Sequence, residues 1–349
     1  MPIVERKSLG DLAPAWDELA GAAPVPSPFL RSWWLESSGG PGSTFLLVLS
    51  GDQLLGGLAV ERDTRFGVER VRMMGSGDLG PDHLDLVAAP EVQSTVESAL
   101  VDWFTRPGGR FVDLAGVVEG AYLESVVAQM GGRQWIESAT APWVELKGDY
   151  EEYRSSLPSR LRNGLARTSS RLKRLGVRYH VVEPEESEEA IEWLRRLHRL
   201  SWGPESTFLP AFPRFARAAS TGIAKRELVI HQLVAGNEVI AIQAWFEVGD
   251  RASFYQSGRN VVDPQWRGAG NVLHAFVAER ACQLGFRELD FLRGSEQYKL
   301  EWADRSRPLV EYLVAKGSRG RVLATAREAR THLEGSLSSH RPSWQHLNL

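Results

Sequence analysis

The sequence predicts a mixed α/β chain with two tandem domains, each built on a mostly antiparallel central sheet flanked by helices. Its 349 residues exceed what one hydrophobic core usually serves, so two domains of about 150–180 residues are expected. Two hairpins are predicted far apart, around a Gly-Asp turn within 45–63 and a Gly-Asn turn within 227–250. Hairpin strands are antiparallel, which gives the sheets their predicted character.

The same order of elements comes after both hairpins. A helix and then a short strand are predicted after each, and the two strands carry Asp113 and Asp290. The ranges are 96–109 with 110–116, and 272–285 with 286–294. The two sets are offset by roughly 180 residues, and such a repeated order indicates an internal duplication.

The region around residue 150 indicates a domain boundary. A strand at 142–147 is followed by a helical pattern from about 150 to 175 and by a strand at 177–183. We therefore expect domains at 1–149 and 150–320. Residues 321–349 are expected to form a C-terminal helix and a polar tail. Within the second domain, the aromatic and proline-broken stretch 206–220 predicts a loop and a short helix.

The composition is that of a globular protein, with 43% hydrophobic and 24% charged residues. A net charge of −3 argues against a dedicated nucleic-acid binder, although it allows a local basic patch. No apolar run approaches the roughly 18 residues of a membrane span, and no signal core follows Met1. The single cysteine, Cys282, excludes an internal disulfide framework, and together these features predict a cytoplasmic protein. The oligomeric state is left open.

The helical pattern after residue 150 is strongly basic. No acidic residue follows Glu152 within it, and its cations are Arg154, Arg160, Arg162, Arg167, Arg171, Lys173 and Arg174. Such a run is either a solvated helix face or a surface that attracts a phosphorylated ligand or an RNA.

The segment QWRGAGN at 265–271 predicts a diphosphate site. It connects a predicted strand at 251–258 to a helix, so its N–H groups lie at the positive end of the helix dipole. Gly268 and Gly270 allow the backbone to approach a ligand closely, and Arg267 adds a charge-assisted bond. The candidate contacts are Gln265, Arg267, Gly268, Ala269, Gly270 and Asn271. Because neither a GxxxxGK[ST] loop nor a G-x-G-x-x-G fingerprint is present, the segment favours coenzyme A over a nucleotide.

The region from this segment to residue 302 resembles a known family. The order strand, QWRGAG, helix, strand and FLRGSEQYKLEW resembles the GNAT superfamily of acyltransferases. More narrowly, it resembles the cellulose-biosynthesis-associated (CelD/BcsL-like) branch, which is related to the FemABX-like aminoacyl-tRNA-dependent transferases. The signature D-F-x-x-G-x-x-x-Y-K-x-x-W is carried by Asp290, Phe291, Gly294, Tyr298, Lys299 and Trp302. The likeness is strongest over about 150–316. It implies two GNAT-like domains and acetyl-CoA or another acyl-CoA as co-substrate.

The resemblance also implies catalytic roles. Acyl transfer from a thioester to an amine needs a neutral amine, an oxyanion donor and a proton for the thiolate. Tyr298 stands where GNAT enzymes often carry the acid, although it could be a packed aromatic residue. Lys299, the only lysine in 226–315, could stabilise the oxyanion or hold an anion, or could be a surface residue. Asp290 and Glu296 are candidate bases or partners of the substrate ammonium.

Further residues are placed near the acceptor by position alone. They are Tyr255, Gln256, Arg293, His198 and Trp202, and His198 could equally lie at the edge of the core. The first domain has no equivalent of QWRGAG, so we expect it not to bind coenzyme A. Its Asp82, His83 and Asp85 predict a turn or an acceptor contact, and no metal site is expected.

The predicted function is therefore an acyl-CoA-dependent N-acyltransferase acting on an amine of a small molecule, sugar or natural product. Transfer is expected to be direct, because no Cys or Ser is placed to act as a nucleophile. Two alternatives stay open: a FemABX-like transferase that uses aminoacyl-tRNA, and a non-catalytic GNAT pair that acts as a binding module. A nucleic-acid partner is expected only in the first of these.

Overall fold

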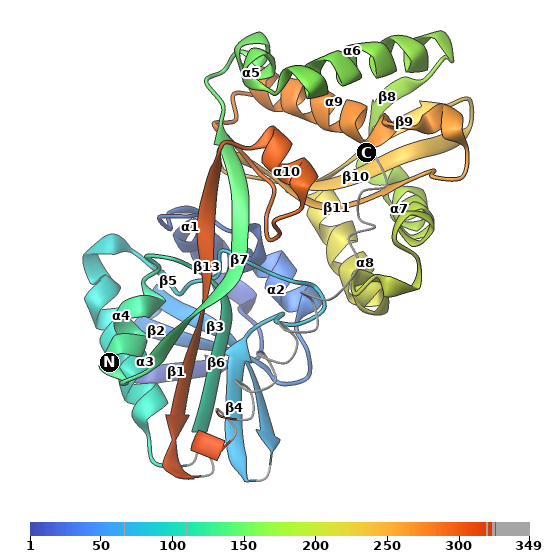
Figure 1. Ribbon diagram of the computed structural model, residues 1–349. Coiled ribbons are helices and arrows are strands. Elements are labelled where there is room, and N and C mark those ends of the chain that lie inside the picture. Colours follow the sequence, from blue (N-terminus) through green and yellow to red (C-terminus); the bar gives the residue numbers. More distant parts are fainter. Residues whose placement is uncertain (66, 109, 319, 323–324, 326–349) are drawn as a thin grey trace. The chain divides into compact units, whose positions relative to one another are not determined.

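The computed structural model describes residues 1–65, 67–108, 110–318, 320–322 and 325 (Figure 1). They form two compact units. Unit 1 comprises Met1–Ala139 and the described residues from Pro308 onward, and unit 2 comprises Thr140–Arg307. None of the described helices has both the length and the apolarity needed to cross a bilayer.

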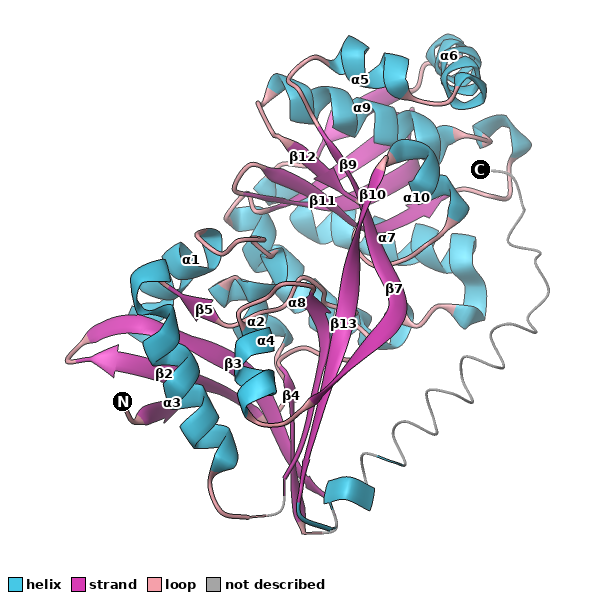
Figure 2. Cartoon of the chain, turned by 60° about the vertical axis from the view of Figure 1, so that its left-hand side comes forward, coloured by secondary structure: helices cyan, strands magenta, loops and turns pink. Residues whose placement is uncertain are grey.

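Unit 1 is a sheet with helices packed on it. The first four strands pair antiparallel in chain order, and the fifth pairs parallel to the fourth. They are β1 (Ile3–Arg6), β2 (Ser43–Ser50), β3 (Gln53–Arg65), β4 (Val68–Met73) and β6 (Arg110–Val118), with the short β5 (Val87–Ala88) beside β3. The helices are α1 (Ala13–Gly21), α2 (Ser32–Ser38), α3 (Gln93–Thr105) and α4 (Leu123–Gln129). Helix α3 lies against β1, β2 and β3 (Figure 2).

Unit 2 repeats this plan. Its first four strands are again antiparallel in chain order, and the fifth pairs parallel to the fourth. They are β8 (Arg178–Val181), β9 (Leu228–Ala235), β10 (Glu238–Val248), β11 (Arg251–Arg259) and β12 (Glu288–Asp290). The helices are α5 (Tyr150–Ser156), α6 (Ser159–Arg174), α7 (Ser187–Trp202), α8 (Phe208–Ala224), α9 (Ala269–Gln283) and α10 (Gln297–Trp302). Helices α6 and α9 lie on one face of this sheet, and α7 and α8 on the other (Figure 1).

The predicted fold and its duplication are confirmed by these matching orders. In each unit two helices separate the first strand from the second, and one long helix separates the fourth from the fifth. Both predicted hairpin turns are present, and their glycines, Gly51 and Gly236, each adopt a left-handed φ of 59°. Short 3-10 helices at Gly10–Leu12, Pro28–Leu30, Pro90–Val92, Pro184–Glu186, Gly203–Glu205 and Pro264–Trp266 complete the elements.

The units divide within two long strands, β7 (Arg133–Glu145) and β13 (Arg305–Lys316). The end of β7 pairs with β12 in unit 2, whereas β13 pairs with β6 in unit 1 from Leu309 to Lys316. Unit 1 therefore includes a strand that the sequence assigned to the domain 150–320. The predicted C-terminal helix and tail, 321–349, lie outside the described residues apart from 321, 322 and 325.

Two local predictions in unit 2 differ from the structure. The single helix expected at 150–175 is interrupted before Ser159, because Pro158 provides no N–H and Leu157 is extended. The loop and short helix expected within 206–220 form one helix, α8, with Pro213 inside it. Its phenylalanines pack on one another, and this packing stabilises the helix despite the proline.

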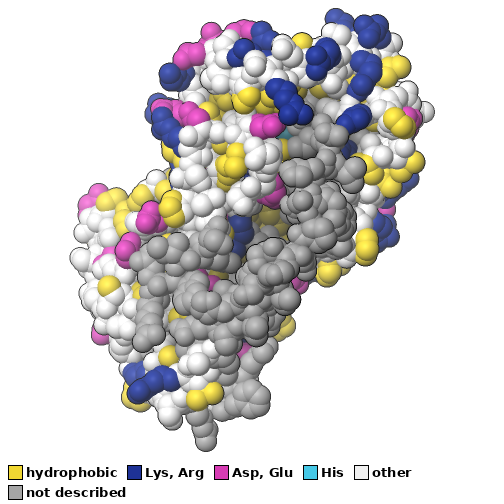
Figure 3. Space-filling view, in the orientation of Figure 1, with side chains coloured by type: hydrophobic (Ala, Val, Ile, Leu, Met, Phe, Trp, Pro, Cys, Tyr) yellow, Lys and Arg dark blue, Asp and Glu magenta, His cyan; other side chains and the backbone are white. Residues whose placement is uncertain are grey.

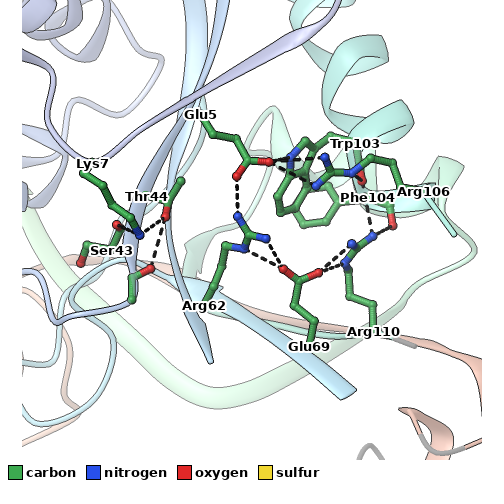
Figure 4. A network of polar contacts seen from close by, with 11 residues as sticks. Glu5, Lys7, Ser43, Thr44, Arg62, Glu69, Trp103, Phe104, Arg106 and Arg110 are labelled. Atoms are coloured by element: carbon green, nitrogen blue, oxygen red, sulfur yellow. Dashed lines mark hydrogen bonds and ion pairs between the residues drawn. The ribbon is translucent and has the colours of Figure 1, made fainter. Parts of the chain in front are cut away.

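A charged network joins five elements of unit 1 (Figure 4). Arg62 of β3 bonds Glu5 at 2.5 Å and Glu69 at 2.7 Å, and Arg110 of β6 bonds Glu69 at 2.8 Å. Trp103 of α3 lies among these groups and donates to Glu5 at 2.8 Å. Although burial raises it, hydrogen bonds from Arg110 and Arg62 hold the pKa of Glu69 below its usual value. The charged groups are thus paired with one another at the side of this sheet.

Candidate active site

The N-terminus of α9 presents uncapped N–H groups. Gly268 is the N-cap residue with a left-handed φ of 83°, and no side chain caps the helix. The helical ladder begins with the Val272 N–H, which donates to the Gly268 carbonyl at 3.2 Å. The N–H groups of Gly268 to Asn271 precede that bond, so they remain as donors at the positive end of the helix. The Arg267 N–H is not among them, because it donates to the Pro264 carbonyl at 3.2 Å.

Neighbouring elements hold this loop from two sides. A Cβ atom at Gly268 would lie 3.2 Å from Thr168 Oγ1 of α6, so a larger residue is disfavoured by contact as well as by φ. Arg171 of α6 donates to the Arg267 carbonyl. From β10, Gln243 Nε2 donates to the Gly270 carbonyl at 3.0 Å. The donors at the helix end are therefore fixed before any ligand binds.

The other predicted loop residues have distinct places. Gln265 is exposed, and its side chain and N–H both bond Asp263, which stabilises the turn. Arg267 has an exposed side chain, whereas Ala269 is fully buried. Asn271 Oδ1 is buried and has no hydrogen-bond partner within the described part of the chain. The loop thus combines backbone donors with one exposed cation.

Strands β11 and β12 diverge beside this loop. Their parallel pairing ends at Ser253 and Asp290. Beyond Asp290 the chain bonds to β7, with Phe291 N–H donating to the Pro142 carbonyl at 2.8 Å, while β11 continues to Arg259. In unit 1, where β4 and β6 part after Asp113, Leu84 forms a bridge to Val117 of β6. In unit 1, the segment at Leu84 therefore occupies the gap between β4 and β6, whereas β11 and β12 diverge in unit 2.

Tyr298 of α10 lies on the α9 face of the sheet. Its ring stacks on His274 with centroids 6.1 Å apart and meets Phe254 edge-on at 6.4 Å. Burial raises the pKa of Tyr298, the charge of Glu296 raises it further, and Arg259 opposes the shift. The phenol consequently stays protonated, so its proton is present at neutral and moderately basic pH.

Lys299 and Glu296 form a pair beside Tyr298. Lys299 Nζ is buried, donates to the Arg293 carbonyl at 2.5 Å and lies 3.0 Å from Glu296 Oε2. Gly294 makes room for this pair, since a Cβ there would lie 2.0 Å from Glu296 Oε2 and 2.6 Å from Lys299 Nζ. Its φ of 131° is also one that glycine tolerates. Lys299 therefore fixes the loop before α10 in addition to placing a positive charge near Tyr298.

Asp290 occupies a structural position. It is fully buried, its Oδ1 accepts from the Leu292 N–H at 2.7 Å, and its Oδ2 lies 3.2 Å from Arg307. Asp113, its counterpart in unit 1, pairs with Arg70 at 2.7 Å. The repeated aspartate is thus engaged by an arginine in both units, and this geometry does not present it to a substrate.

Three predicted acceptor residues contact the opposite side of the sheet. Tyr255 packs on Phe208 and Phe215 of α8. His198 Nδ1 bonds the Ser257 carbonyl at 2.9 Å, its Nε2 bonds Ser206 Oγ at 2.8 Å, and Trp202 stacks on it. Burial lowers the pKa of His198. These three side chains lie among α7 and α8 instead of near Tyr298.

The remaining predicted residues are partly exposed or structural. Gln256 and Arg293 are half-buried near the end of β11 and before α10. In unit 1, His83 Nδ1 lies 3.0 Å from Asp82 Oδ1, and both side chains are fully buried. Asp85 accepts the N–H groups of Leu86, Tyr122 and Leu123. It therefore stabilises the start of α4.

Sequence reasoning missed two residues at this site, His274 and Arg259. His274 is one turn after Gly270, and its buried Nδ1 has no partner among the described residues. Burial lowers the pKa of His274 to about 3, and the charges of Lys299 and Arg259 lower it as well. Burial also lowers the pKa of Arg259. The only sequence signal was a histidine between the apolar positions Leu273 and Val277 of the helix.

The basic character of α6 is retained on its outer side. Lys and Arg side chains gather over α5 and α6 (Figure 3). Arg160, Arg167, Lys173 and Arg174 are exposed, and none of them forms an ion pair within the described residues. The buried residues of α6 are Leu161, Leu165 and Leu172. The helix thus packs through leucines and exposes unpaired cations.

Comparison with known proteins identifies the kind of domain that unit 2 contains. Residues 159–300 match the protein family described as acetyltransferase (GNAT) domain. Unit 2 carries a GNAT N-acyltransferase domain. This match begins with α6 and ends within α10, and it includes the start of α9 and Tyr298. No curated protein matches the sequence.

Solved structures show the same fold over nearly the whole chain. FemX is 8% identical, with a TM-score of 0.65, over 90% of this chain and 98% of FemX. L-PGS from Bacillus licheniformis is 12% identical, with a TM-score of 0.56, over 92% of this chain and 96% of its own. A tandem GNAT protein from the clavulanic acid pathway is 13% identical, with a TM-score of 0.50, over 90% and 98% of the two chains. At these identities the likeness concerns the fold alone.

Proposed function

We propose that this GNAT enzyme uses acyl-CoA, with acetyl-CoA as the simplest donor, and transfers the acyl group directly to an amine. The acceptor class is a small molecule, a sugar or a natural product. The observation that carries the proposal is the uncapped start of α9, where left-handed Gly268 leaves N–H donors at the positive end of the helix. A diphosphate matches these donors in charge and in hydrogen bonding.

In the proposed reaction, Tyr298 and Glu296 each handle one proton. The amine attacks the thioester carbonyl, the carbon–sulfur bond breaks, and the Tyr298 hydroxyl gives its proton to the leaving thiolate. The raised pKa of Tyr298 keeps that proton available. Glu296 retains 39% exposure, whereas Asp290 has none. Glu296 is therefore the carboxylate that receives the ammonium or its proton.

The finer assignments belong to this proposal as well. We assign the chain to the cellulose-biosynthesis-associated branch on its D-F-x-x-G-x-x-x-Y-K-x-x-W residues. We also assign it to the cytoplasm, because its single cysteine is a free thiol and forms no disulfide. No metal takes part in the proposed step.

Calorimetric titration with acetyl-CoA tests the donor. The wild-type protein is expected to bind, and Gly268→Ala is expected to weaken binding at least about tenfold by moving the loop away from α6. Gly285→Ala is the matched control, because Gly285 is also left-handed, with φ 78°, and has open space around it. An absence of heat with wild-type protein at millimolar acetyl-CoA would remove this donor.

A second donor, aminoacyl-tRNA, is favoured by one specific observation, the unpaired cations of α6. Such a surface attracts a polyanion, and its affinity falls steeply with salt. A gel shift with charged tRNA at two salt concentrations separates the donors. If tRNA binds tightly with a steep salt dependence while acetyl-CoA does not bind, the enzyme belongs to the FemABX-like class instead.

A further inference from the structure

Arg259, the last residue of β11, is half-buried, and its guanidinium has no partner among the described residues. No carboxylate lies within ion-pair distance of its guanidinium among the described residues, and no hydrogen bond to the guanidinium is formed there. Only its backbone is engaged: its N–H donates to Ser201 Oγ at 2.8 Å, and Ser201 donates to its carbonyl at 3.0 Å. Partly desolvating an arginine without pairing it is unfavourable, which suggests that another group binds it.

The side chain of Arg259 passes the first turn of α9. Its Cδ atom lies 3.8 Å from the place that a Cβ atom of Gly270 would occupy. Its charge also lowers the pKa of His274 and opposes the rise in the pKa of Tyr298. The guanidinium is therefore within electrostatic range of the N–H donors, the buried imidazole and the phenol.

We propose that Arg259 binds the same diphosphate to which the N–H groups of α9 donate hydrogen bonds, and so positions the acyl donor between β11 and α9. This inference rests on the proposed function, because it assigns one more contact to the same site. A guanidinium presents parallel N–H donors that fit two phosphate oxygens. Together with the N–H groups of Gly268 and Gly270, Arg259 encloses the anion from the strand side.

Binding of the anion would also change the field at Tyr298. An unneutralised arginine favours the tyrosinate, whereas a diphosphate bound to it cancels that effect. The charge of Arg259 then no longer lowers the pKa of Tyr298 when the donor is present. Arg259 acts on the reaction through the donor and through Tyr298, which makes it a positioning residue.

Calorimetry with Arg259→Gln, Arg259→Lys and the control Arg287→Gln tests the inference. Arg287 is 82% exposed, so its loss removes the same charge away from the site. We expect Arg259→Gln to weaken CoA binding about 10- to 100-fold, Arg259→Lys to weaken it less, and Arg287→Gln to leave it unchanged. Binding of the phosphate-free thioester S-acetyl-N-acetylcysteamine should be the same in all four proteins. The melting temperature of Arg259→Gln should change little, because the guanidinium forms no hydrogen bond or ion pair with the described residues.

Inorganic diphosphate serves as a second probe that does not depend on the donor. If wild-type protein binds diphosphate and Arg259→Gln does not, the inference stands even where acetyl-CoA fails to bind and the proposed function falls. If both proteins bind CoA and diphosphate equally, the inference is overturned while the function survives. Equal losses for CoA and for the phosphate-free thioester would likewise overturn it.

Discussion

At the scale of single residues, the best-defined group is Tyr298. Its ring rests on His274 and Phe254, and its hydroxyl lies in a buried, partly charged setting. Phenylalanine at this position would retain both ring contacts and would lose only the hydroxyl group with its proton. Tyr298 is therefore a position where packing and proton transfer can be separated by one substitution.

The variant Tyr298→Phe is expected to lower kcat at least about a hundredfold, the usual contribution of a general acid. KM for the donor and the melting temperature should change little. Because burial raises the pKa of Tyr298 above its usual value near 10, wild-type activity should not decline through this group between pH 8 and 10. Steady-state kinetics over that range check both points. A variant with full kcat would show that Tyr298 only packs.

At this scale, the sequence pointed to a candidate residue where a motif contained it. Tyr298, Lys299 and Glu296 come together in the structure as their spacing around α10 implied. Arg259 and His274 carry no motif, and their importance comes from burial and missing partners, which arise only in the folded chain. Asp290 stood out in the sequence because both halves carry it, yet its ion pair with the distant Arg307 could not be read from local spacing.

At the scale of elements, helix α6 holds the loop 265–271 in place. It contributes Thr168 and Arg171 to the contact with Gly268 and Arg267. A glycine, Gly164, lies in its middle, where an added Cβ would meet nothing within 4 Å. The helix therefore includes a residue that costs stability without contributing a contact.

Replacing Gly164 by alanine is expected to stabilise the protein by about 0.5–1 kcal/mol, because alanine restricts the unfolded backbone and favours helix. Gly176→Ala is the control: Gly176 follows the same helix in open space, but its φ of 73° is left-handed. That variant should lose about 1 kcal/mol. Urea unfolding measures both changes. Destabilisation by Gly164→Ala would argue against a continuous helix at that point.

Elements were predicted best where their own sequence decides them. The hairpins at β2–β3 and β9–β10 follow from alternating apolar residues and a glycine turn, which are local signals. The length of helix α8 was underestimated because a proline such as Pro213 ordinarily ends a helix. The helix is stabilised by contacts among its aromatic residues and with Tyr255, and such tertiary packing cannot be read from the local sequence. The break before α6 is caused by Pro158. The prediction missed it because the helical pattern on both sides of Pro158 was given more weight than the proline.

At the scale of the whole molecule, individual buried groups in the two units respond to acid in opposite ways. In unit 2, burial lowers the pKa of both His231 and His274 to about 3. The unfolded chain, with a pKa near 6.5, therefore binds protons first, and stability is lost as the pH falls below 6.5. In unit 1, burial raises the pKa of Asp85 to about 6, against the effect of three backbone hydrogen bonds. This folded aspartate takes up its proton first, which adds stability as the pH falls through 6.

Between pH 7 and pH 5, unit 2 is expected to lose about 2 kcal/mol per buried histidine, while protonation of Asp85 adds stability to unit 1. Hydrogen exchange at the two pH values, read separately for strands β9–β11 and β2–β4, checks the contrast. In the variant His274→Phe, the number of protons that unit 2 takes up on unfolding below pH 6.5 should be smaller by about one. An unchanged dependence in this variant would mean that His274 is protonated in the folded protein.

The late position of β13 in the chain has a consequence for how the protein is made. Unit 1 needs β13, whose pairing with β6 begins at Leu309, although the rest of its sheet is complete by Ala139. During synthesis the ribosome therefore releases the strand that closes the first sheet only after all of unit 2 has been translated. The nascent first half must wait with the edge of β6 uncovered, and a messenger cut short before codon 309 would yield a first half that lacks its closing strand.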